Sequence, residues 1–74
     1  MGDSMFFYDG EVLHLGNFKN ILYVENNLII VKFQKYKLIV KGESLKIIQL
    51  EEDEMYIQGI VNKLEINYEK WMYI

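Results

Sequence analysis

Apolar and polar residues alternate along most of the chain, and short turn sequences separate the alternating segments. Ile, Val, Tyr and Phe dominate these segments, and β-branched and aromatic residues favour a pleated sheet over a helix. Short segments of this kind that recur with turn signals between them predict an all-β fold. We expect six strands, at residues 11–15, 20–24, 28–33, 36–41, 44–50 and 55–68.

The residues between these segments indicate how the strands connect. Asn26 and Asn27 predict a tight two-residue hairpin in which both residues adopt positive φ. Gly42 separates the fourth and fifth strands, residues 51–54 form an acidic turn, and Gly59 interrupts the sixth strand. Glycine within a strand pattern predicts a bulge or a sharp bend. The expected fold is therefore a single antiparallel meander curved by glycine bulges, either a small sandwich or an open barrel.

Alternation assigns one face of the strands to the core. The apolar residues that share this face are Ile29, Val31, Phe33, Tyr36, Leu38, Val40, Leu45, Ile47, Met55, Ile57, Leu64 and Ile66. At the two glycines, a positive φ would exclude β-branched side chains. We therefore predict that valine at Gly42 or Gly59 destabilises the fold.

The opposite face is not uniformly polar. It carries Lys32, Lys37, Lys41 and Lys46, but also apolar residues at Leu22, Val24, Leu28, Ile30, Ile39, Ile48 and Ile60. A single sheet without helices leaves this side uncovered, and large exposed apolar patches mark interaction surfaces.

This second face therefore predicts a homo-oligomer. The expected contact lies around Ile30, Ile39 and Ile48, or in the aromatic C-terminal tail with Trp71, Tyr73 and Ile74. For the tail, packing back onto its own sheet is an equal alternative.

Length and composition define one small domain that needs help to be stable. The chain has 74 residues and no Cys, which excludes disulfides and thiolate zinc sites and leaves partner subunits as an aid to stability. We assign residues 1–10 to a flexible or vector-derived N-terminal segment and residues 11–74 to the domain. No apolar run approaches the ~20 residues of a transmembrane helix. Without a recognisable signal peptide, the cytoplasm is the expected location.

The residues offer no arrangement suited to catalysis. Ser4 and Ser44 are the only serines, and His14, the only histidine, lies within an apolar strand pattern. The acidic run at residues 51–54 lacks the ligand spacing of a calcium loop. We therefore expect no enzyme activity, no catalytic residue, no cofactor and no metal.

Lysines on the middle strands leave one alternative function open. Lys32, Lys35, Lys37, Lys41 and Lys46, together with Tyr36, would form a face for anions or nucleic acid. The net charge of −3 and the absence of Arg argue against nucleic acid. Lysines near strand edges also prevent aggregation, which is the simpler explanation.

Residues 13–68 resemble the YabP/YqfC family of small sporulation proteins of spore-forming bacteria. The resemblance rests on a short opening strand that ends at Gly16, a strand leading to the Asn26-Asn27 turn, and a central hairpin. Residues 40–47 (VKGESLKI) are similar to the family's glycine, x, x, leucine, x, isoleucine element, and residues 57–64 (IQGIVNKL) to its closing glycine element.

The resemblance implies a non-enzymatic role in spore formation, in the mother cell during morphogenesis or coat assembly. Other sporulation proteins, including a membrane protein, would be the partners. Within the matching elements, the fold determinants would be Gly42, Leu45, Ile47, Gly59 and Leu64.

Overall fold

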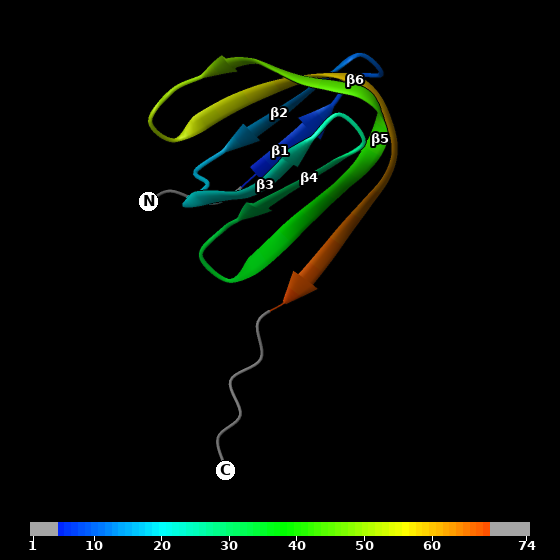
Figure 1. The fold of residues 1–74 in the computed structure, drawn as a ribbon. Helices are drawn as coiled ribbons and strands as arrows, with labels where there is room; N and C mark the ends of the chain where they lie inside the picture. Colours follow the sequence, from blue (N-terminus) through cyan, green and yellow to red (C-terminus); the bar gives the residue numbers. More distant parts are fainter. Residues whose placement is uncertain (1–4, 69–74) are drawn as a thin grey trace.

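The protein forms one antiparallel sheet. The computed structural model describes residues 5–68. Its elements are β1 (Met5–Tyr8), β2 (Val12–Gly16), β3 (Asn20–Glu25), β4 (Leu28–Lys32), β5 (Tyr36–Leu50) and β6 (Glu54–Tyr68). The strand order is β1-β2-β6-β5-β4-β3, so β1 and β3 lie at the two ends and the sheet does not close (Figure 1). The expected all-β architecture is confirmed, but the strands do not form a simple meander, because β2 pairs with β6 and not with β3.

The long β5–β6 hairpin bends the sheet into two layers, as Figure 1 shows. Layer A contains β3, β4, residues 36–41 of β5 and residues 63–68 of β6. Layer B contains β1, β2, residues 55–58 of β6 and residues 46–50 of β5. Each long strand therefore has one half in each layer. In layer A the C-terminal half of β6 lies at the edge of the sheet, because it pairs only with β5. In layer B the C-terminal half of β5 lies at the edge, because it pairs only with β6.

Two sequence-based assignments need correction. The predicted strands at residues 36–41 and 44–50 are one strand, because the register shifts at Gly42 and beyond bend β5 without ending it. The segment expected to be flexible contains β1, which pairs with β2. Asp9 closes this hairpin by accepting hydrogen bonds from the backbone N–H groups of Glu11 and Val12, both at 2.9 Å. These bonds, led by the one from Val12, lower the pKa of the Asp9 carboxyl.

Both glycines at the bend are required, for different reasons. Gly59 has a φ of +144°, which L-residues rarely adopt, as predicted. Gly42 does not have a positive φ. There the constraint is space, because a Cβ atom would overlap the backbone carbonyl oxygen of Ile60. Ser44, with a φ of 54°, is the residue of this segment of β5 that adopts the left-handed conformation.

The predicted hairpin turn is present, with Glu25 paired to Leu28 across Asn26 and Asn27. The expected positive φ values are wrong, because neither asparagine has one. Instead, the turn supports the bend of β5. The carbonyl oxygen of Asn27 accepts a hydrogen bond from the Gly42 N–H at 3.2 Å, and that of Asn26 accepts one from Leu45 at 2.8 Å. Backbone groups that leave the β4–β5 ladder are thereby satisfied.

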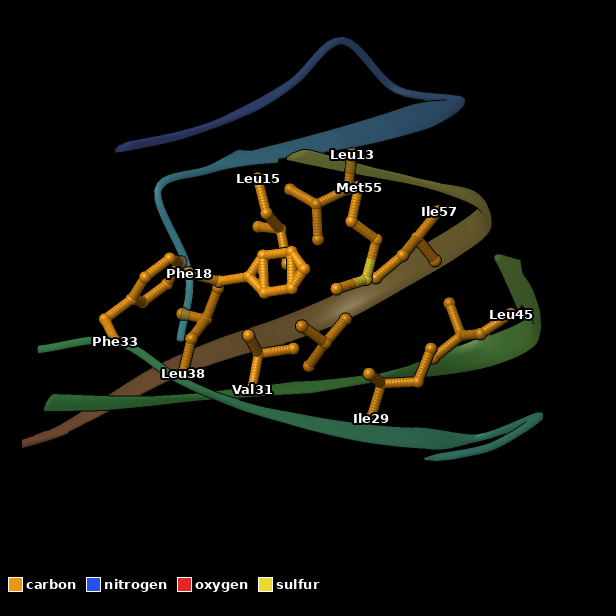
Figure 2. Close-up of a cluster of buried hydrophobic side chains, with 11 residues drawn as sticks. Leu13, Leu15, Phe18, Ile29, Val31, Phe33, Leu38, Leu45, Met55 and Ile57 are labelled. Carbon is orange, nitrogen blue, oxygen red and sulfur yellow. The ribbon is translucent and has the colours of Figure 1, made fainter. Parts of the chain in front are cut away.

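The core lies between the two layers. Figure 2 shows Leu13 and Met55 of layer B pointing toward Val31 of layer A. The buried hydrophobic residues are Leu13, Leu15, Phe18, Ile29, Val31, Phe33, Leu38, Val40, Leu45, Met55 and Ile57. Most of the predicted core is confirmed, and Tyr36, Ile47 and Leu64 pack at its margin. Ile66 is a wrong assignment: it is 43% exposed because it lies on the edge half of β6.

The hydroxyl of Tyr8 connects β1 to the bend of β6. Its oxygen accepts a hydrogen bond from the Val61 N–H at 3.1 Å, and it lies 3.1 Å from the carbonyl oxygen of Gly59 and 3.0 Å from that of Gly10. We expect Tyr8→Phe to lower the free energy of unfolding by about 1–3 kcal/mol, because partly buried backbone groups lose their partner. Urea denaturation measures this loss. Tyr23→Phe on the exposed edge of β3 is the control, and an equal effect of both changes would contradict the prediction.

Candidate interaction surface

The outer face of layer A combines isoleucines with lysines. Ile30 lies directly opposite Ile39 on the neighbouring strands β4 and β5, and both are half-buried. The structure thus brings together two of the residues that the sequence placed at an interface. Lysine pairs flank them on the same face: Lys32 opposite Lys37, and Lys41 opposite Lys63.

The other predicted interface residues are not part of this face. Ile48 lies on the half of β5 that belongs to layer B, at a register shift, and it is exposed at that layer's edge. Trp71, Tyr73 and Ile74 lie outside the described residues. The isoleucine patch that the sequence suggested therefore does not form as one surface.

The lysine face also differs from its sequence-based description. Tyr36 lies on the opposite side of β5, where its ring packs against Phe33 at 5.0 Å and Tyr68 at 5.6 Å between ring centroids. Lys46 belongs to layer B.

Part of the positive charge on this face is neutralised locally. The carboxylate of Glu65 lies 2.9 Å from the Lys63 ammonium and 3.6 Å from that of Lys41. The hydrogen bond from Lys63, followed by the charge of Lys41, holds the pKa of the Glu65 carboxyl below its ordinary value. Glu65 is therefore ionised at neutral pH, and it compensates the two lysines that face each other across β5 and β6.

Exposed apolar side chains gather along the open strand edges, which sequence alternation did not reveal. Within residues 5–68, four edges have a strand partner on one side only: β1, β3, the layer B half of β5 and the layer A half of β6. The exposed large hydrophobic residues on them are Met5, Phe7, Leu22, Tyr23, Val24, Ile48, Leu50, Ile66 and Tyr68. Alternation distinguishes the two faces of a strand but does not show which strand lies at an edge.

His14 has a structural environment. Its ring stacks on that of Tyr56, with centroids 4.3 Å apart and planes 4° from parallel. Its Nε2 atom lies 3.5 Å from the carboxylate of Glu54. Both neighbours come from β6, directly across from β2, so His14 contributes to strand pairing on the outer face of layer B.

The remaining polar features are local. The acidic run forms the β5–β6 turn, in which the Glu51 N–H donates to the Glu54 carbonyl at 2.8 Å. An open cleft of about 250 Å³ beside the bend is lined by Gly10, Glu11, Gln58, Gly59 and Ile60. In the described part of the chain, no three His, Cys, Asp or Glu side chains cluster to hold a metal ion. Across residues 5–68 there is also no helix with the length and apolar character needed to cross a membrane.

These features define a small all-β protein of one sheet, bent into two layers, with apolar side chains along its open edges. A family model for the YabP family matches residues 3–71. The chain therefore belongs to the YabP family, and the match includes β1 as well as the residues that carried the resemblance. This membership suggests a sporulation-related protein. Comparisons with curated proteins and with solved structures gave no match.

Proposed function

We propose that this protein is a non-enzymatic, self-associating structural module of spore formation, acting in the cytoplasm of the mother cell during morphogenesis or coat assembly. Membership of the YabP family supports the link to sporulation. The observation that carries self-association is the set of exposed apolar side chains along the four open edges of the described sheet.

Such edges are costly to leave open. An open edge presents unpaired backbone N–H and C=O groups, and a flat apolar edge promotes uncontrolled aggregation unless a specific partner covers it. A domain of 74 residues also gains more from a partner than a large domain, because it buries a small fraction of its own surface. A closed contact between identical copies, most often two-fold, meets both needs.

The purified protein should therefore have a concentration-dependent mass. Light scattering is expected to give a mass above the 8.9 kDa of the monomer at high concentration, and a decrease toward it on dilution. The contact buries apolar edge surface, so moderate salt should not abolish it. A mass that stays at 8.9 kDa up to millimolar concentration would refute the proposal.

The alternative function is binding of anions or nucleic acid through layer A. It is favoured by the lysines that neighbouring strands present on one face, Lys32 opposite Lys37 and Lys41 opposite Lys63, since a positively charged sheet face can contact phosphate groups. Titration with a single-stranded oligonucleotide at low salt tests it. Strong binding that falls steeply with salt would favour this alternative, whereas we expect no measurable binding.

A further inference from the structure

The four open edges of the described sheet are not equivalent. Strand β1 has only four residues, and short edge strands resist pairing with other chains. Register shifts interrupt β3 between Ile21 and Tyr23, and the layer B half of β5 between Ile47 and Gln49. Such bulges also protect an edge. The layer A half of β6 has neither protection, because its pairing with β5 is regular from Lys63 to Tyr68.

The backbone groups on this β6 edge can be assigned from neighbouring hydrogen bonds. At the two ends of the β4–β5 ladder, the Phe33 N–H donates to Tyr36 and the Gly42 N–H donates to Asn27. From Tyr36 to Gly42, even-numbered residues of β5 therefore direct their backbone groups toward β4, and odd-numbered ones direct theirs toward β6. In β6, residues 63, 65 and 67 then face β5, so the outward N–H and C=O groups belong to Leu64, Ile66 and Tyr68.

We propose that this edge binds the same edge of a second copy, with the two β6 strands antiparallel about a two-fold axis at Leu64. The inference rests on the proposed self-association and names its surface. In this register Leu64 faces Leu64 of the partner subunit, and outward backbone groups meet each other. Lys63 faces Glu65 of the partner subunit, and this contact occurs twice because the axis repeats it.

Charge selects this register over its neighbours. An axis at Glu65 would place two carboxylates directly opposite each other, which is unfavourable. An axis at Ile66 would place Glu65 opposite the uncharged Asn67. Of these three registers, the axis at Leu64 is the one that matches both Lys63 and Glu65 with opposite charges. In this register Ile66, which is 43% exposed in the single chain, lies opposite Asn62 of the partner subunit, whereas Tyr68 reaches the level of the bend.

Charge reversal tests the contact directly in the full-length chain. Lys63→Glu places a carboxylate opposite Glu65 of the partner subunit, and Glu65→Lys places an ammonium group opposite Lys63 of the partner subunit. In a dimer of either variant alone, the two subunits therefore repel each other at both contacts. We expect each to raise the dimer dissociation constant by about tenfold or more, because attraction becomes repulsion twice. An equimolar mixture of the two variants should associate again, since every contact is then between opposite charges. The double variant should also associate on its own.

Lys37→Glu is the matched control, because it reverses a lysine on the same face, one strand away from the edge. It should leave the dissociation constant unchanged. Circular dichroism verifies that each variant is folded. Association of the mixture and of the double variant would show that the single variants lose the contact through mismatched charges and not through unfolding. If the wild type associates and both single variants associate equally well, or if their mixture stays monomeric, the β6 contact is wrong and self-association stands. A wild type that is monomeric at all concentrations overturns both proposals.

Discussion

Replacing Gly42 with alanine is expected to lower the free energy of unfolding by about 3 kcal/mol or more. The new Cβ atom would overlap the Ile60 carbonyl oxygen, and it would lie 3.1 Å from Cδ2 of Leu45. A carbonyl group within the β5–β6 ladder cannot rotate away, so the two strands must separate where the sheet bends. A domain of this size has a total stability of only about 4–11 kcal/mol, so much of the population should unfold.

Gly16→Ala is the matched control for this measurement. Gly16 is also a buried strand glycine, but a Cβ atom there meets the side chain of Met5 at 3.2 Å, and a flexible methionine can move. We expect a change within about 1 kcal/mol, because alanine also reduces the entropy of the unfolded chain. Urea denaturation of both variants gives the comparison. Similar midpoints would show that the bend tolerates a side chain and that the contact with Ile60 is not a constraint.

The fold class and most strand positions could be predicted because alternation, turn residues and β-branched content agree along the chain. The two layers could not be predicted in the same way. Leu64 and Ile66 have the same pattern as Met55 and Ile57 within one strand, yet only the second pair is fully buried. The difference arises because β6 has neighbours on both sides in layer B and on one side in layer A. Neighbours that are distant in sequence leave no local signal.

The first strand was missed for a related reason. Met5, Phe6 and Phe7 are consecutive apolar residues, so they show no alternation. In the structure Phe6 and Tyr8 pack against the core, whereas Phe7 is exposed on the outer face. Pairing with β2 imposes this two-residue period, and nothing in the residues themselves does so.

The candidate interface was predicted in part. Ile30 and Ile39 share a face because β4 and β5 form a tight hairpin with regular pairing, which sequence can indicate. Ile48 was expected to join them, since it follows Ile39 along what reads as the same face. The register shifts between Lys41 and Gln49 turn β5 into the other layer and separate the two positions. Lys63 and Glu65 are two residues apart in the sequence, but this spacing gains a meaning only because both residues lie at an edge of the sheet.

The second large effect is expected at Leu13, which alternation alone did not assign to the core. Leu13→Ala should lower the free energy of unfolding by about 2–5 kcal/mol, the range for removing a leucine side chain from a packed core. Leu13 is fully buried, faces Ile57 across β2 and β6, and points toward layer A (Figure 2). A cavity at this position would loosen the contact between the layers, because strands on either side cannot close it without breaking their ladders.

Leu22→Ala provides the same substitution at an open edge. Leu22 is 47% exposed on β3, at the register shift, so we expect a loss within about 0.5 kcal/mol. Denaturation at low protein concentration keeps self-association out of the comparison. If Leu22→Ala were as costly as Leu13→Ala, β3 would not be an open edge in solution, and the comparison of edges that singles out β6 would lose its basis. A small effect at Leu22 with a large one at Leu13 would place the core between the layers and leave the edges free for a partner.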